Sequence, residues 1–382
     1  MIGLAVPEIG DEERRLVDDS LRTGWIAYGP YVDQLEADIC ELLGVEHAVA
    51  VGSGTAALHL ALVAAGVEPD DEVLVSTLSF ISPAFAIRYV GARPVFFDAE
   101  PVHWQIDVDK LAAFLREECE RRDSKLVNKA SGRRIGALLP VGILGHMFDA
   151  DAIRELATEY ELPLVEDAAE SLGSRYKDRP GGTVGDISCL SFNGNKIVTC
   201  GGGGMVVTND ERHAERVRYL ATQAKDDPLE YIHGEVGFNY RLANPLAAIG
   251  VAQLQKLDEF VARKRAIFEV YRETLSDLPG VSFQREADWA FSTFWLASMR
   301  VDEAAFGMGS RDLMHRLLDA GIQVRPFWQA LHDSPSMAGS QAYRIEVASA
   351  LVAESLMLPC SVGLTEADQA RVIETIRGLK PE

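Results

Sequence analysis

The sequence predicts an α/β fold, in which a large domain with a mainly parallel sheet is followed by a smaller α+β domain. Short apolar runs typical of buried strands alternate with helix-like segments through the first two thirds of the 382 residues. Near residue 245 the alternation stops and a long helical pattern begins. We therefore predict a large α/β domain at residues 1–245, and a long connecting helix with a small C-terminal domain at residues 246–382.

The first half of the predicted sheet comes from runs rich in Val and Phe. We expect strands at residues 47–51, 71–76 and 93–98, and a helix at residues 55–66 that ends at Gly66. The strand runs are short and mostly apolar, which is typical of strands that helices cover on both faces.

The second half continues the same alternation. Residues 135–141 and 162–167 predict strands, and the acidic start of residues 149–161 favours a helix between them. Two further runs, residues 187–192 and 205–209, predict two more strands.

The C-terminal part begins with a helix signal. Asn244 can cap a helix and Pro245 suits its first position, so residues 246–275 are expected to form one long helix. Residues 291–301 then predict a strand, and residues 310–322 predict a helix.

Composition excludes several classes of partner. The formal net charge of −21 argues against sequence-independent binding to nucleic acid or an anionic membrane, because both need clustered Lys and Arg. The five cysteines form no CxxC pair and no His cluster has zinc spacing, so neither a metal site nor a disulfide framework is expected. The N-terminus lacks a signal-peptide pattern and no apolar run approaches the ~20 residues of a membrane span, which predicts a cytoplasmic protein.

The first chemical candidate is the turn at residues 51–58, "VGSGTAAL". Gly52 and Gly54 permit a tight turn after a strand, and Thr55 opens a helix whose free N–H groups favour an anion. The same glycines fit a dinucleotide-binding pattern, but the next strand ends in Ser76 where that pattern requires an acid. An anion site and a purely structural turn both remain open.

Two further candidates lie at predicted strand ends. Asp167 could pair with a cationic ring nitrogen or cap the next turn. Lys196 lies between two strands and before the glycine run Gly201–Gly204, so it is either a surface residue or a desolvated amine that attacks carbonyls. The glycines favour close approach by a cofactor or partner. Together the anion site, the aspartate and the lysine match the needs of pyridoxal 5'-phosphate.

Five segments carry a family resemblance: "GSGTAALHLAL", "STLSFISPAFAI", "VEDAAESLGSRY", "SFNGNKIVTCGGGGMVVTND" and "VGFNYRLANPLAAIGVAQL". In this order they resemble the DegT/DnrJ/EryC1/StrS family of pyridoxal phosphate-dependent sugar aminotransferases, and the resemblance covers nearly the whole chain. It implies the type I fold of these transferases, which is like that of aspartate aminotransferase. "SFNGNKI" and "VPEIG" are most similar to the LegC-like branch, which aminates nucleotide-linked 4-keto-6-deoxy sugars in nonulosonic acid, perosamine-type or bacillosamine-type pathways.

The resemblance implies roles for individual residues. Lys196 forms the internal aldimine, and Asp167 keeps the pyridine nitrogen protonated. Glu170 lies near the cofactor 3-hydroxyl, although it could instead be a solvated carboxylate. The residues implied at the cofactor phosphate are Gly54, Thr55, Ala56 and Ser191.

Further implied roles concern the ring, the second subunit and the sugar. Phe80 stacks on the cofactor ring, unless it belongs to the core. Asn239 reaches the phosphate of a neighbouring subunit, which implies a homodimer with shared active sites, unless it merely caps a helix. Arg325 and His332 fall where the family contacts the sugar nucleotide, and Arg325 suits a diphosphate.

The implied activity is a ping-pong aminotransfer. Glutamate donates its amine to the cofactor, a nucleotide-linked keto-deoxy sugar then accepts it for surface polysaccharide, glycan or antibiotic sugar synthesis, and Lys196 moves the proton. A few relatives carry histidine at this position and dehydrate sugars, so Lys196 keeps the amine route open. Alternatives are an aminoshikimate-type aromatase of the same family, a non-catalytic regulatory protein that keeps the fold, and a nucleotide-dependent oxidoreductase.

Overall fold

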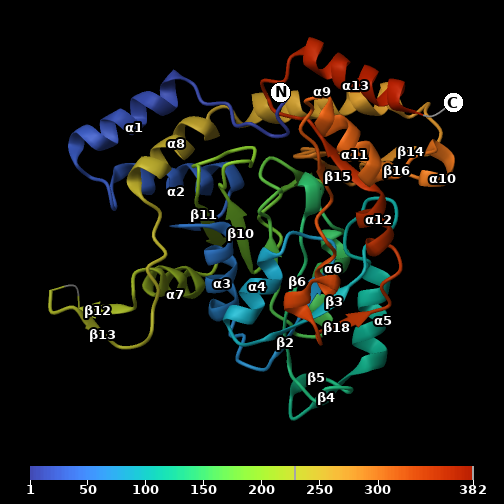
Figure 1. Ribbon diagram of the computed structural model, residues 1–382. Coiled ribbons are helices and arrows are strands. Elements are labelled where there is room, and N and C mark those ends of the chain that lie inside the picture. The colour runs from blue at the N-terminus through green and yellow to red at the C-terminus, as the bar shows by residue number, and fades with distance from the viewer. Residues whose placement is uncertain (228, 381–382) are drawn as a thin grey trace.

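The computed structural model describes residues 1–227 and 229–380. At its centre lies a mainly parallel sheet, as predicted (Figure 1). Its strand β11 is antiparallel to both of its neighbours, which the sequence did not indicate. Isolated bridges between Leu138 and Leu164 and between Val141 and Asp167 join its two halves. The strands lie in the order β1 (His47–Val51), β11 (Gly204–Thr208), β10 (Ile187–Ser191), β7 (Val165–Asp167), β6 (Ile135–Leu139), β2 (Glu72–Ser76), β3 (Arg93–Phe97) and β18 (Gln341–Tyr343).

Helices cover both faces of this sheet because its strands carry apolar side chains on both. In β2, Val73 and Val75 pack into one hydrophobic cluster, and Leu74 between them packs into another. The first cluster includes residues of α3 (Gly54–Ala64), α4 (Ser82–Tyr89) and α7 (Glu211–Ala221). The second includes residues of α5 (Val108–Glu118) and α6 (Ala150–Glu159).

A smaller antiparallel sheet forms the C-terminal part of the molecule. Its strands lie in the order β14 (Val281–Phe283), β16 (Ala297–Val301), β19 (Ser355–Leu358) and β17 (Arg325–Pro326). The helices of this part are α9 (Leu257–Leu275), α10 (Glu303–Phe306), α11 (Ser310–Asp319), α12 (Ala348–Glu354) and α13 (Glu366–Leu379). The predicted single strand at residues 291–301 is wrong: β15 (Ala290–Phe291) and β16 are separate, and Phe294 between them has a φ of 46°.

The predicted single helix at residues 246–275 is also wrong. The structure has α8 (Asn244–Leu254) and then α9, and Lys256 between them departs from helical geometry. Asn244 does not cap α8, since Ala243 takes that position. Its side chain instead accepts the N–H of Tyr31 and donates to the carbonyl of Trp25. In this way α8 is fastened to α2 (Pro30–Leu43), while α1 (Asp11–Thr23) packs against it as well (Figure 1).

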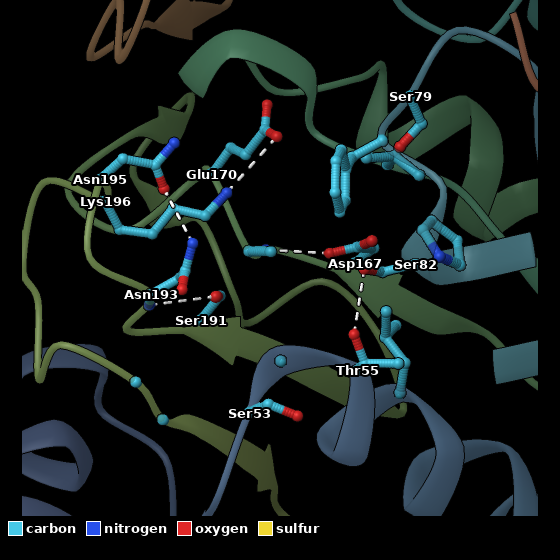
Figure 2. Close-up of a pocket in the computed structure, with 18 of the residues that line it drawn as sticks. Ser53, Thr55, Ser79, Ser82, Asp167, Glu170, Ser191, Asn193, Asn195 and Lys196 are labelled. Carbon is cyan, nitrogen blue, oxygen red and sulfur yellow. Dashed lines mark hydrogen bonds and ion pairs between the residues drawn. The ribbon is translucent and has the colours of Figure 1, made fainter. Parts of the chain in front are cut away.

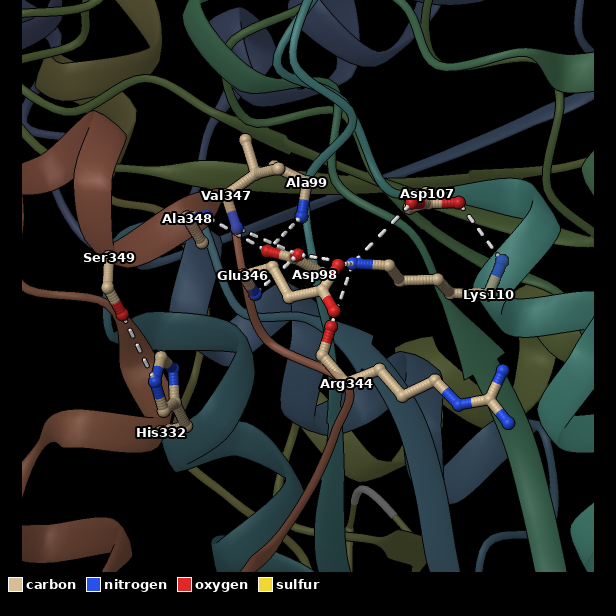
Figure 3. Close-up of polar contacts among 10 residues, drawn as sticks. All are labelled: Asp98, Ala99, Asp107, Lys110, His332, Arg344, Glu346, Val347, Ala348 and Ser349. Carbon is tan, nitrogen blue, oxygen red and sulfur yellow. Dashed lines mark hydrogen bonds and ion pairs between the residues drawn. The ribbon is translucent and has the colours of Figure 1, made fainter.

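A buried carboxylate joins the C-terminal chain to the large sheet (Figure 3). Asp98, just after β3, accepts the N–H groups of Glu346, Val347 and Ala348 at 2.8, 3.0 and 2.8 Å, at the start of α12. Lys110 donates to the same carboxylate at 2.7 Å. Burial alone raises the pKa of Asp98, but these donors outweigh burial and lower it. Just before Glu346 in the chain, β18 pairs with β3 and so ties the same segment to the sheet.

The remaining elements are short. In Figure 1 the hairpin of β12 (Lys225–Asp227) and β13 (Ile232–His233) projects away from the sheet, and Leu229 and Tyr231 between its strands are exposed. The short elements are β4 (Cys119–Arg122), β5 (Lys125–Asn128), β8 (Arg175–Tyr176), β9 (Arg179–Pro180), β12 (Lys225–Asp227), β13 (Ile232–His233), η1 (Ile143–Gly145), η2 (Leu331–Asp333) and η3 (Pro335–Met337).

Candidate active site

A cavity of about 410 Å³ opens where strands of the central sheet end, and Figure 2 shows the side chains that line it. Asp167 ends β7 and Ser191 ends β10, which is the edge at which open α/β sheets bind ligands. The structure brings many of the predicted site residues together here. The predicted residues that line the cavity are Gly54, Thr55, Phe80, Asp167, Glu170, Ser191 and Lys196.

The N-terminus of α3 forms one wall of the cavity. Ser53 caps it, and its Oγ accepts the N–H of Ala56 at 3.0 Å. Gly54 lies so close to Ser191 that a Cβ on it would be 2.8 Å from the Ser191 Cβ. Thr55 Oγ1 donates to Ser82 at 3.0 Å. Free N–H groups, the helix dipole and several hydroxyls therefore meet here, which suits an anion.

The glycine run has a partly structural explanation. A Cβ on Gly204 would be 2.4 Å from the carbonyl carbon of Ser53, because β11 lies against the start of α3. Gly201 and Gly203 have φ values of 79° and 148°, which favour glycine. Gly202 and Gly203 line the cavity, so close approach by a ligand to this run stays a prediction beside the structural explanation.

Asp167 is a buried carboxylate, only 3% exposed. Its Oδ1 accepts the N–H of Ala169 at 3.0 Å. The pKa of Asp167 is raised to about 7, mainly by burial and also by the neighbouring Glu170, while the Ala169 N–H and Lys196 oppose the increase. A cationic group placed next to Asp167 would stabilise its ionised form.

Lys196 reaches into the cavity from the loop after β10 and lies between an acid and an aromatic ring. Its Nζ is 3.5 Å from Glu170 Oε1 and 3.9 Å from the centre of the Trp295 ring. Glu170 also accepts the N–H of Leu144 at 2.7 Å. Burial raises the pKa of Glu170, and the charge of Lys196 opposes that increase.

An aromatic wall completes the cavity, and the sequence did not reveal it. Trp295 and Trp328 line the cavity with their rings stacked at 6.0 Å and 21°. Phe80, 48% exposed, meets Trp328 edge to face at 5.9 Å. Trp295 falls in residues 291–301, which the sequence predicts as a strand. A large apolar residue in a strand ordinarily belongs to the core and does not indicate a functional site. Trp328 lies between Arg325 and His332, which the family resemblance places at the sugar nucleotide, but it is not itself among the predicted site residues.

Four predicted site residues do not line the cavity. Ala56 lies in the first turn of α3, and its N–H already donates to Ser53. Asn239 is exposed, next to Tyr240, whose carbonyl accepts the N–H of Gly52 at 2.7 Å. The remaining two, Arg325 and His332, belong to the C-terminal part of the chain.

Arg325 and His332 contact their own chain. Arg325 in β17 is exposed, and its Nη1 donates to the carbonyl of Val324 at 2.9 Å. His332 in η2 shares a 2.7 Å hydrogen bond with Thr77, which follows β2, and approaches Ser349 at 3.5 Å (Figure 3). Their predicted roles toward a sugar nucleotide stay predictions.

In residues 1–227 and 229–380 no group of His, Cys, Asp and Glu side chains could hold a metal ion. No helix of this part is long and apolar enough to cross a membrane. All five cysteines have free thiols.

Comparisons with known proteins identify the family of this chain. Residues 7–377 match the model of the DegT/DnrJ/EryC1/StrS aminotransferase family. EpsN of Bacillus subtilis (strain 168), whose name describes a pyridoxal phosphate-dependent aminotransferase, is 39% identical over 98% of this chain and 95% of its own length. GDP-perosamine synthase of Caulobacter vibrioides is 37% identical over 98% and 97%. The crystal structure of S. venezuelae DesV with a ketimine intermediate has a TM-score of 0.86 at 30% identity and covers 100% of both chains.

The chain therefore belongs to the DegT/DnrJ/EryC1/StrS aminotransferase family. This membership confirms the predicted type I α/β fold and the predicted enzyme class. The relatives found do not single out the narrower LegC-like branch, since they include EpsN and GDP-perosamine synthases.

Proposed function

We propose that this enzyme transfers an amine from glutamate to a nucleotide-linked keto-deoxy sugar. The observation that carries the proposal is the single cavity in which Lys196, Asp167 and the N-terminus of α3 meet. The names of the relatives support the substrate class, because GDP-perosamine synthases occur among them. A 4-keto-6-deoxyhexose, as in the LegC-like branch, remains our narrower proposal.

The predicted cofactor, pyridoxal 5'-phosphate, is confirmed by the relatives and fits the residues present. The start of α3 suits its phosphate, with Thr55 and Ser191 as neighbouring hydroxyls. Asp167 is buried with a raised pKa, so it gains most from a cationic partner such as a pyridinium. When bound, the cofactor acts as an electron sink for bond breaking at the amine-bearing carbon.

The side chains of this enzyme supply binding, orientation and proton transfer. Asp167 holds a proton on the ring nitrogen. Lys196 Nζ would hold the cofactor, and this amine would also serve as the general base and acid that moves the proton. Phe80 and the two tryptophans give the cavity an apolar wall.

The other predicted partners are part of the proposal. Glutamate is the proposed donor, and the protein is proposed to work as a cytoplasmic homodimer in which Asn239 serves the neighbouring subunit's site. Arg325 and His332 are proposed to face the sugar nucleotide once it binds. The aromatase and the non-catalytic protein that keeps the fold are the alternatives that the test must separate.

The test is a pair of half-reactions followed by absorbance of the cofactor. Glutamate is expected to convert the enzyme to its amine form, and a panel of UDP-, GDP- and dTDP-linked keto sugars is expected to convert it back. Lys196→Ala abolishes both steps, whereas Lys125→Ala, an exposed lysine of β5, changes neither. If no keto sugar in the panel is turned over and the enzyme acts on an aminated or keto cyclitol instead, the aromatase is favoured. No conversion by glutamate or any amine would favour the non-catalytic protein.

A further inference from the structure

The amine of Lys196 lies against two groups that the sequence did not connect with it. The centre of the Trp295 ring lies 3.9 Å from Lys196 Nζ, and Glu170 Oε1 lies 3.5 Å from the same nitrogen. An ammonium group is attracted by the face of an indole within about 6 Å, and tryptophan is the strongest of the aromatic side chains in this respect. The lysine side chain is only 12% exposed, so water competes weakly for it.

The position of Trp295 is fixed on several sides. Its indole N–H donates to the carbonyl of Asn195 at 2.7 Å, one residue before Lys196. Its own carbonyl accepts from the Nζ of Lys264 at 2.9 Å, and Lys264 is a lysine of α9 that is only 4% exposed. Trp328 stacks on its ring. The ring therefore has little freedom to turn away from Lys196.

Leu144 connects the ring and the carboxylate. Its N–H donates to Glu170 at 2.7 Å, and its carbonyl accepts the N–H of Trp295 at 3.0 Å. Leu144 is fully buried with a φ of 60°, a conformation that non-glycine residues rarely adopt. This backbone conformation lets Leu144 bond both the Glu170 carboxylate and the Trp295 backbone. The contacts therefore form a closed circuit through Lys196, Glu170, Leu144 and Trp295.

We propose that Glu170 and the face of Trp295 form a seat for the free amine of Lys196. The inference rests on the proposed function, since aminotransfer releases this amine from the cofactor in each half-reaction and then needs it as a base. The seat keeps the released amine at the cavity wall, ready to exchange protons and to re-form its bond. Trp295 and Leu144 are then positioning residues, and Trp295 acts through its ring face.

The test replaces Trp295 with fluorinated tryptophans in the full chain, freed of cofactor with hydroxylamine. Each added fluorine weakens the attraction of the ring for a cation and hardly changes its size. The readout is the labelling rate of Lys196 by an amine-reactive reagent, divided by that of exposed Lys125 and measured by peptide mass spectrometry. A seated amine reacts more slowly, because it must leave the ring first. We expect the rate to rise stepwise with fluorination, by about twofold to thirtyfold in total.

The same series at Trp328 is the matched control, because Trp328 also lines the cavity whereas the lysine amine lies over the ring of Trp295. Glu170→Gln, which keeps the shape of the side chain, is expected to speed labelling by about threefold to tenfold, since 3.5 Å is long for a hydrogen bond between charged groups. No trend at Trp295, or an equal trend at both tryptophans, overturns the seat. The labelling assay uses neither an amino donor nor a sugar, so its result does not depend on whether the proposed function is correct.

Discussion

Replacing Asp167 with Asn is expected to stabilise the cofactor-free protein as it destroys activity. Burial raises the pKa of Asp167 from 3.8 to about 7, so the native state holds this proton where the unfolded chain has lost it. The native state therefore binds one more proton between these two pH values, and stability falls as pH rises through them. Asparagine carries no such penalty, and its side-chain oxygen can still accept the N–H of Ala169.

The magnitude follows from the width of that window. Each pH unit within it contributes about 1.4 kcal/mol, so from pH 5 to pH 8 the advantage of Asp167→Asn over the wild type should grow by about 2 to 3 kcal/mol. The assay is urea unfolding of both cofactor-free proteins at the two pH values. Asp210→Asn is the control: the Arg212 guanidinium lowers the pKa of Asp210, which therefore titrates below this window.

Two outcomes decide whether this reasoning holds. Bound pyridoxal phosphate supplies Asp167 with a cationic partner, so saturating the wild type with it should remove most of the pH-dependent disadvantage. An advantage of Asp167→Asn that is the same at both pH values would show that the carboxylate is already ionised in the cofactor-free native state, and the argument would then be wrong.

Three further changes test other parts of the site. Gly54→Ala should weaken retention of the cofactor about tenfold, because the new methyl group displaces the side chain of Ser191. Gly378→Ala is the control, since a methyl group there meets open space and should leave retention unchanged. Equal retention by the two variants, measured by dialysis, would refute this. Asn239→Ala mixed with Lys196→Ala should recover one intact site per mixed dimer, and verified heterodimers without activity would defeat the cross-subunit role. Arg325→Ala should raise the KM for the keto sugar by about tenfold to a hundredfold and spare the glutamate half-reaction. The reverse pattern would make Arg325 a clamp for the donor carboxylate.

Much of the fold could be predicted because the apolar runs are local signals. The strands around Val75 and Phe96 are buried on both faces, and a continuous apolar run records that directly. The break at Lys256 could not be predicted, because every residue from Leu246 to Leu275 is acceptable in a helix. It arises from packing, since α8 packs on α1 and α2 while α9 packs on α13 and β14. The division of the chain near residue 245 stays a prediction.

The same contrast applies to the site. Asp167 and Lys196 were found because residues at the ends of buried strands converge at one edge of a sheet, whatever the loops do. Trp295 was not found, because its place depends on a bend at Phe294 and on hydrogen bonds to Leu144 and Asn195, both distant in sequence. A tryptophan in an apolar run is ordinarily a core residue.

These observations make the cavity a product of two parts of the chain. Lys196 and Asp167 come from the central sheet, whereas Trp295 and Trp328 come from the C-terminal part. The C-terminal part is tied to the sheet by the three N–H bonds to Asp98, well away from the aromatic wall in sequence. Loosening that tie should therefore shift the aromatic wall while Asp167 keeps its place at the end of β7. Loss of catalytic rate is then expected to precede loss of cofactor binding, because α3, whose N-terminus is the proposed phosphate site, packs on the central sheet.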